Sequence, residues 1–401
     1  MKMLAVLPAV LACSTVWAQD VSIKPNADLR LRYEHVDQDG LPREADALTL
    51  RARLGVTAAR GPWSALVEGE AVLALNDRYN DGLNGRTAYP VVADPGNLEL
   101  NRAQLRYADK GGQAVTLGRQ RIELADQRFV GSAPWRQSEQ TFDAVRVQYG
   151  RSLGVQIDLT YAASLRTVNG RQGFGARPAS VDGDNVFALL GYALKPGTLT
   201  AFAYLVDQDL AALQGYRLSS QTYGVRFAGA TPIGKGARLG YTASWARQSD
   251  WHRNPNDYAA TYALGEATLA VGGFNAAAGY EVLGADTGAA LTSVQTPLSS
   301  LFKWNGWAGK FGTTPPDGLR DAYATFGHGW KGAGPFDQLS LSATLHRFDS
   351  DRAVRHYGDE LDLLLTARRG KATVSARLAH YQADRWATDT DKFWLQLDWS
   401  Y

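Results

Sequence analysis

Hydrophobic and polar residues alternate along most of this chain, in segments of roughly ten residues separated by polar connections. Successive side chains of a β-strand point to opposite faces, so each segment predicts a strand with one apolar and one polar face. In the last segment Phe393, Leu395 and Leu397 share one face, and Trp394 is the large apolar residue on the other. Such an ending is typical of a barrel whose last strand pairs with the first, and the alternative is the last strand of a soluble sandwich.

The pattern predicts eighteen strands, with sixteen as the alternative count, joined by connections that are alternately short and long. We place the strands at about residues 29–34, 48–57, 63–73, 97–107, 113–123, 140–149, 154–165, 184–194, 198–207, 218–229, 236–248, 257–269, 273–284, 318–328, 336–348, 357–368, 371–383 and 391–401. An even count puts both chain ends on one side, as in single-chain outer-membrane barrels, whose long loops face outward. The predicted fold class is therefore all-β, a transmembrane antiparallel β-barrel.

Composition agrees with a barrel and excludes some other classes. The 401 residues are 45% hydrophobic and 20% charged, and no run of about 18 apolar residues follows the N-terminus. The formal net charge of +2 gives no argument for a nucleic-acid partner.

The N-terminus predicts a cleaved secretory signal. Lys2 precedes an apolar run, and Val16-Trp17-Ala18 offers a small-residue cleavage site, so we expect a signal peptide at 1–18 and the barrel at 19–401. A lipoprotein with a lipidated Cys13 is the alternative. Cys13 is the only cysteine, so the cleaved chain has no disulfide or thiolate metal site. We expect the mature chain in the outer membrane of a Gram-negative cell, surrounded by lipid and recognised by the barrel-assembly machinery through strand 391–401.

The polar faces carry many charged residues. Barrels of 16 to 18 strands enclose an aqueous lumen, so these faces should point into it. The inward arginines are Arg30, Arg32, Arg51, Arg53, Arg102, Arg106, Arg146, Arg226 and Arg377, and the inward acids are Glu34, Glu68, Glu70 and Asp158. Arginine binds planar carboxylates with two parallel hydrogen bonds, which favours an anion pathway. The alternative is a neutralised ladder that only stiffens the wall.

Three stretches carry a resemblance to a known family. The first is Leu31-Arg32-Tyr33-Glu34; the second runs from Leu117-Gly118-Arg119 through Arg128, Trp135 and Arg136 to Phe142-Asp143; the third runs from Pro297 through Phe302-Lys303-Trp304 and Trp307 to Arg320-Asp321. In these stretches the chain resembles the alginate-export family of proteobacterial outer-membrane proteins, whose best-known member passes a polyuronate to the cell exterior.

The resemblance implies an eighteen-stranded barrel with an arginine-rich, anion-selective pore. It carries the family's lumen arginines chiefly to Arg32, Arg53, Arg102 and Arg146, with Arg128, Arg136 and Asp143 in or beside its loop motif. Adding the residues placed inward by the strand pattern, the expected solute pathway consists of Arg32, Arg53, Arg102, Arg106, Arg128, Arg136, Arg146, Glu34, Glu70 and Asp143. The expected solute is an acidic polysaccharide such as alginate or its fragments, and the alternative is another small carboxylate or aromatic acid.

An unusually long connection, 285–316, carries four large aromatic residues and is expected to fold over or into the lumen, or to form an external cap. Enzyme signals are weak. The six histidines lack metal-ligand spacing, and a barrel hydrolase built on Ser342, His346 and Asp349 would need an outward-facing Ser–His pair. We therefore expect no enzyme activity, cofactor or metal.

Overall fold

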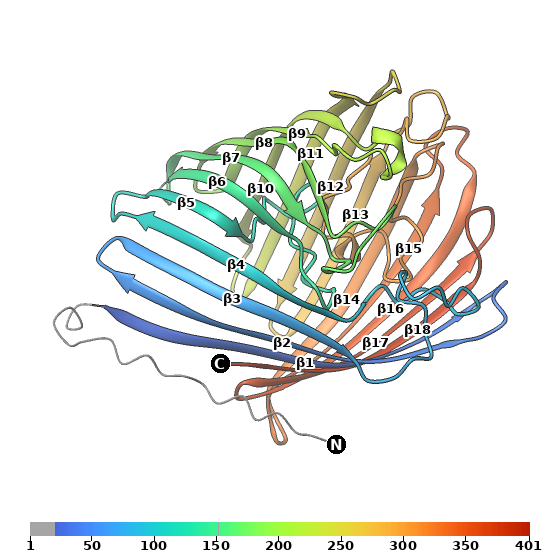
Figure 1. The fold of residues 1–401 in the computed structure, drawn as a ribbon, viewed down its shortest axis with the longest axis horizontal. Helices are drawn as coiled ribbons and strands as arrows, with labels where there is room; N and C mark the ends of the chain where they lie inside the picture. The colour runs from blue at the N-terminus through green and yellow to red at the C-terminus, as the bar shows by residue number, and fades with distance from the viewer. Residues whose placement is uncertain (1–20, 151) are drawn as a thin grey trace.

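The computed structural model describes residues 21–150 and 152–401, and within them the chain forms one antiparallel sheet of eighteen strands (Figure 1). The strands are β1 (Ser22–Gln38), β2 (Ala45–Arg60), β3 (Trp63–Ala74), β4 (Asn97–Ala108), β5 (Gln113–Gln120), β6 (Thr141–Gly150), β7 (Gly154–Arg166), β8 (Ser180–Ala193), β9 (Gly197–Val206), β10 (Ser220–Pro232), β11 (Ala237–Asp250), β12 (Ala259–Val271), β13 (Phe274–Leu283), β14 (Leu319–Ala333), β15 (Phe336–Asp349), β16 (His356–Arg369), β17 (Ala372–Ala383) and β18 (Thr390–Ser400). Two 3₁₀ turns, η2 (Gln214–Tyr216) and η3 (Leu301–Lys303), complete the elements. The expected signal peptide, with Cys13, lies outside the described residues.

The sheet closes into a barrel because its first and last strands pair. β1 pairs with β18 from Asp28 opposite Ser400 to Gln38 opposite Thr390, and every other strand pairs with its neighbours in sequence. Closure satisfies the backbone groups of both end strands, which would otherwise form open edges. The predicted strand count and the closing role of the last strand are confirmed. No helix among the described residues is long and apolar enough to cross a membrane.

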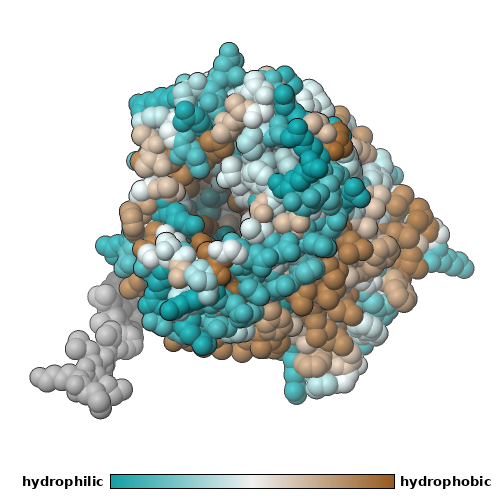
Figure 2. Space-filling model, turned by 90° about the vertical axis from the view of Figure 1, so that its right-hand side faces the viewer, coloured by the Kyte–Doolittle hydropathy of each residue, from teal (hydrophilic) through white to brown (hydrophobic). Residues whose placement is uncertain are grey.

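The alternation of side chains places apolar residues outside and polar residues inside. On β18, Leu395 and Leu397 are 47% and 43% exposed, whereas Gln396 between them is only 5% exposed. On β2, Leu54 is 60% exposed and the adjacent Arg53 is 5% exposed. Figure 2 shows hydrophobic surface along the barrel wall, beside polar surface that surrounds a hollow at the loop end. The inward placement of the arginine-bearing faces follows from this register.

Three strands differ from the predicted bounds for local reasons. β1 begins at Ser22, because its polar first residues still pair with β2 although they show no alternation. β14 continues to Ala333, where a glycine-rich run conceals a hairpin that pairs Ala333 with Phe336. β5 stops at Gln120, after which the chain turns into the barrel.

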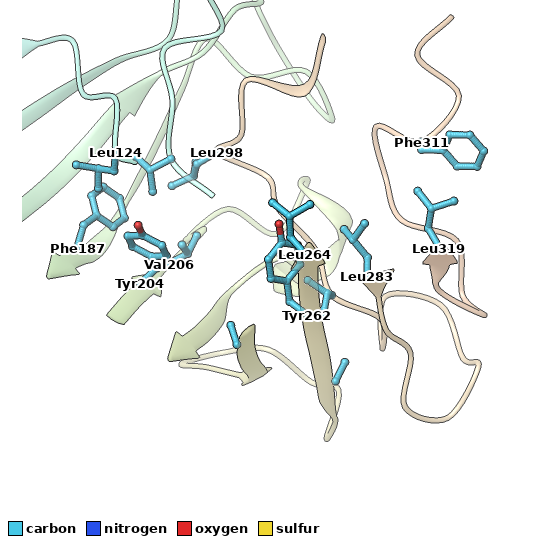
Figure 3. Packing of buried hydrophobic residues seen from close by; sticks show 14 of the residues in the cluster. Leu124, Phe187, Tyr204, Val206, Tyr262, Leu264, Leu283, Leu298, Phe311 and Leu319 are labelled. Atoms are coloured by element: carbon cyan, nitrogen blue, oxygen red, sulfur yellow. The ribbon is translucent and has the colours of Figure 1, made fainter. Parts of the chain in front are cut away.

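The long connections lie at one end of the barrel and the short turns at the other (Figure 1). Two long connections, loop 121–140 and loop 284–318, pack inside the barrel. Figure 3 shows Leu124 and Leu298, one from each loop, beside Phe187 and Tyr204 of the wall. The interior is thus partly filled by a hydrophobic core between loops and strands, and loop 284–318 folds inward rather than forming only an external cap.

Candidate permeation pathway

Four arginines on β1 and β2 form what we call the arginine wall: Arg30, Arg32, Arg51 and Arg53. Three of them hold the backbone of loop 121–140. Arg30 and Arg32 both donate to the carbonyl oxygen of Trp135, at 3.2 and 2.5 Å. Arg53 donates to the carbonyl oxygen of Gln137 at 3.3 Å. The loop is therefore fixed through its backbone acceptors.

Four acids on β13, β14 and β16 form an acidic wall: Glu281, Asp321, Glu360 and Asp362, all 1–2% exposed. They bind loop 284–318 by accepting hydrogen bonds from its N–H groups. The backbone N–H of Trp307 donates to Asp362 at 3.2 Å, and that of Ala308 donates to Glu360 at 2.7 Å. The Asn305 amide donates to Glu281 at 2.8 Å. Backbone and amide donors thus compensate for part of the buried negative charge.

The two loops also bind each other. The backbone N–H of Gly131 donates to the Leu298 carbonyl at 2.9 Å, within a short parallel bridge between Val130 and Leu298. Arg128 of the first loop contacts Glu281 at 2.7 Å and donates to the Asn305 side-chain oxygen at 2.9 Å. The loops therefore form one folded unit across the barrel interior.

This unit divides the interior into two cavities. A loop-end cavity of about 480 Å³ lies among Gln38, Lys392 and loop residues, and a mid-barrel cavity of about 950 Å³ lies beyond. Seven residues line both cavities, and we call them the partition: Trp135, Arg136, Leu301, Phe302, Trp304, Asn305 and Trp307. The two cavities therefore adjoin at this partition.

Parallel aromatic rings build the centre of the partition. Trp135 stacks on Phe302 with ring centroids 3.8 Å apart and planes 8° apart. Phe302 in turn lies parallel to Trp307, at 5.7 Å and 10°. The guanidinium carbons of Arg32 and Arg377 lie 4.0 and 4.2 Å from the Trp135 ring centroid, within cation–π range. Rings and cations thus adjoin at the point where the cavities meet.

Most of the predicted pathway residues are already paired. The ion pairs are Arg32 with Asp94 (3.2 Å), Arg53 with Glu70 (2.5 Å), Arg102 with Glu68 (2.6 Å), Arg128 with Glu281 (2.7 Å), Arg146 with Asp158 (2.5 Å) and Asp143 with Arg119 (2.8 Å). Arg106 donates to Thr116 and Gln148, and Glu34 lines the loop-end cavity. Of the predicted arginines, only Arg136 lines both cavities.

Among the described residues that line the cavities, four cations form no ion pair and no side-chain hydrogen bond: Arg136, Arg177, Arg377 and Lys392. The pathway predicted from the sequence contains only the first. Arg377 and Lys392 sit on recognisable polar strand faces, whereas Arg177 comes from loop 167–179, which has no periodic pattern. Two unpaired guanidinium nitrogens of Arg377 are buried. A buried unpaired cation is costly, so these groups are suited to receive an anion.

Arg177 is held close to other loops. A Cβ atom added to Gly82 would lie only 2.4 Å from a guanidinium nitrogen of Arg177, so the two loops pack closely here. Gly82 also has a φ of +90°, a backbone conformation that favours glycine. Burial lowers the pKa of Arg177, the charge of Arg136 lowers it further, and Asp81 acts in the opposite direction. Arg136 and Arg177 are therefore close enough to repel each other.

The geometry gives little support to hydrolysis or metal chemistry. Both ring nitrogens of His346 face acids inside the barrel, Asp321 at 2.9 Å and Asp362 at 3.9 Å, and not an outward serine. Among the described residues, no cluster of three or more histidines, cysteines or acids has an arrangement that could hold a metal ion.

A family model described as alginate export matches residues 22–282, more than half of the chain. No curated protein matches the sequence. Similar solved structures include OccAB1 of Acinetobacter baumannii, with a TM-score of 0.69 at 11% identity over 94% of this chain and 96% of that one. OccAB3 of the same species has a TM-score of 0.66 at 14% identity, covering 94% and 99%. OpdL of Pseudomonas aeruginosa has a TM-score of 0.65 at 15% identity, covering 94% and 98%.

At these identities the solved structures show a shared fold alone. The family match confirms the resemblance and covers the first two of the three stretches that carry it, whereas the third, from Pro297 to Asp321, lies outside the matched residues. Together with the closed barrel, these similarities support an outer-membrane porin channel.

Proposed function

The chain belongs to the alginate export family, and from this and from its unpaired cations we propose that it is an outer-membrane channel for small anionic solutes. The proposal includes short fragments of acidic polysaccharides and other small carboxylates, which cross by passive diffusion. The apolar outer wall suits a lipid environment, since alternation puts apolar side chains toward lipid and polar ones toward the lumen.

The observation that carries the proposal is the contrast between paired and unpaired cations. Charged residues along the wall are largely neutralised by partners, but Arg136 and Arg377 adjoin the partition without one. In a water-filled passage with low-dielectric walls, a few uncompensated charges raise the local concentration of anions and repel cations. We therefore expect a positive field at the partition.

The size of the passage favours small solutes over a long polymer. The two inward loops fill much of the interior and leave cavities of about 480 and 950 Å³ on either side of the partition. Cavities of this size enclose a small molecule. A polyuronate would have to thread past Trp135 and Phe302, which are stacked together and lie on loops anchored to different walls, so fragments fit better than chains.

The test is ion selectivity in planar bilayers. The reversal potential in a KCl gradient should show preference for chloride in the wild type, and replacing Arg136, Arg177 and Arg377 by glutamine should abolish most of it. Low salt sharpens the result, because the Debye length is about 10 Å at 0.1 M ionic strength.

A charge-matched control is the double variant Arg146→Gln, Asp158→Asn, which removes a paired cation together with its partner. It should leave the reversal potential close to that of the wild type. A wild-type pore that prefers potassium, or a triple glutamine variant with unchanged selectivity, would refute the proposed function.

A further inference from the structure

The loop-end cavity has an unusually aromatic lining. Six tryptophan and phenylalanine side chains border it: Trp135, Phe302, Trp304, Trp307, Phe311 and Trp394. Phe302 and Trp307 are nearly parallel, so a flat molecule that stacks on this pair would meet rings already aligned with it. Aromatic rings prefer such offset stacking to random contact.

The same cavity holds cations that can receive an anion. Arg136 and Arg177 both line it without an ion pair in the described chain, and they lie close enough for mutual repulsion. Glu34 is the carboxylate that lines the cavity, and it lies in the field of Lys392. A carboxylate between the two arginines would relieve their repulsion and form charge-assisted hydrogen bonds.

Two side-chain amides that line this cavity, those of Asn305 and Asn80, already have partners. The Asn305 side-chain oxygen accepts from Arg128, and its amide donates to Glu281 and Asp321. The Asn80 side-chain oxygen accepts from the Gly82 backbone. A sugar ring carries hydroxyl groups that need partners when water is removed, and an aromatic ring does not.

We propose that the loop-end cavity binds a single-ring aromatic carboxylate, with the ring against Phe302 and Trp307 and the carboxylate between Arg136 and Arg177. This assignment rests on the proposed function, because it names the class of anion that the channel selects before the partition. Its volume of about 480 Å³ fits a ligand with one ring, near the lower end of the usual range for small-molecule sites.

The mid-barrel cavity shares the partition residues but lacks Arg177, Phe311 and Trp394. The rest of its lining includes hydroxyl and amide side chains such as Thr242, Thr325, Thr344 and Gln396, together with paired charges and the unpaired Arg377. The aromatic acid is therefore selected at the loop end and crosses a polar space after the partition.

The experiment compares three probes of equal charge: benzoate, cyclohexanecarboxylate and glucuronate. Each is added to single wild-type channels in KCl, and the concentration that halves the current is measured. Benzoate and cyclohexanecarboxylate differ mainly in ring planarity and aromaticity. We expect benzoate to block at a concentration lower by roughly fivefold than cyclohexanecarboxylate, the size of one good aromatic contact, and glucuronate to block least.

Two sets of variants separate the ring contact from the charge contact. Trp307→Leu should bring benzoate to the level of cyclohexanecarboxylate, and Trp307→Phe should retain most of the preference. Arg136→Gln with Arg177→Gln should weaken block by all three probes, by roughly tenfold for benzoate. Trp251→Leu and Arg253→Gln, whose side chains line neither cavity, are the controls and should leave all three values unchanged.

The wild-type measurements alone distinguish the outcomes. An anion-selective channel that responds equally to benzoate and cyclohexanecarboxylate would overturn the aromatic assignment and leave the proposed function standing. Stronger block by glucuronate would overturn it in favour of an acidic sugar. A cation-selective channel that ignores all three probes would overturn both.

Discussion

The arginine wall and the acidic wall carry opposite charges and have the same structural role. Arg30, Arg32 and Arg53 bind carbonyl oxygens of loop 121–140. Glu360 and Asp362 bind backbone N–H groups of loop 284–318. A buried charge needs a hydrogen-bond partner. The arginines therefore bind backbone carbonyl oxygens, and the carboxylates bind backbone N–H groups.

The comparison shows that charge in a barrel lumen is not by itself a solute pathway. Many of these charged groups are used to hold the two loops in place. The groups left to act on a solute are few and lie where the loops meet. Selectivity should therefore depend on a few unpaired cations, while stability depends on the walls.

Removing one loop at a time should produce the largest difference in ion selectivity between the two walls. Replacing 285–316 by a short Gly-Ser turn should raise the conductance and shift selectivity toward cations, because the acidic wall then faces water. Replacing 122–139 in the same way should also raise the conductance but shift selectivity toward anions, because it exposes the arginine wall. Conductance and reversal potential are read together, and equal shifts in the same direction would refute the opposed roles of the walls.

The strand pattern of the sequence was sufficient to predict the barrel. Period-two alternation determines which residues face inward, and the hairpin register then places Arg53 opposite Glu70 and Arg102 opposite Glu68. The inward folding of loop 121–140 had no such signal, because its contacts are made by an irregular backbone. The Arg32–Asp94 pair joins a strand to a distant loop and follows only from the folded structure.

The candidate site was harder to predict than the fold for the same reason. Arg136 came from a recognisable motif, but Arg177 lies in a loop without periodicity and reaches the cavity only by crossing Gly82. The sequence also cannot show which arginines have partners, since that depends on how the loops dock. The predicted pathway therefore combined residues that fix the loops with one residue at the partition.

Two single substitutions should show a smaller difference between the walls, in how much each contributes to the free energy of unfolding. Arg32→Gln removes the partner of Asp94, which is 2% exposed, and the donor to the Trp135 carbonyl. Breaking a buried ion pair costs about 3–5 kcal/mol, so the free energy of unfolding should fall by that order. Glu360→Gln keeps an oxygen that can accept from Ala308 and should cost less. Urea unfolding in detergent measures both, and equal losses would contradict the unequal roles.

The smallest expected effect concerns Lys310, on loop 284–318 near the loop-end cavity. Burial lowers its pKa to about 8, and the positive charge of Lys392 adds to this, whereas Glu360 and Asp389 act in the opposite direction. The folded loop therefore binds fewer protons at this site than an unfolded chain between pH about 8 and the ordinary 10.5. By linkage, docking of the loop becomes more favourable as the pH rises through that window, and the positive field at the loop end becomes weaker.

Raising the pH from about 7 to about 9.5 should thus reduce the anion preference of the wild type slightly, since Lys310 loses its charge before ordinary lysines do. Lys310→Met removes the titrating group, so its reversal potential should vary less with pH over the same range. Lys303→Met provides a matched control, because Lys303 lies on the same loop and donates to the Asp126 carbonyl; this variant should keep the pH dependence. If Lys310→Met and the wild type respond alike, the ammonium of Lys310 does not contribute to the field at the loop end, and selectivity depends on the other cations.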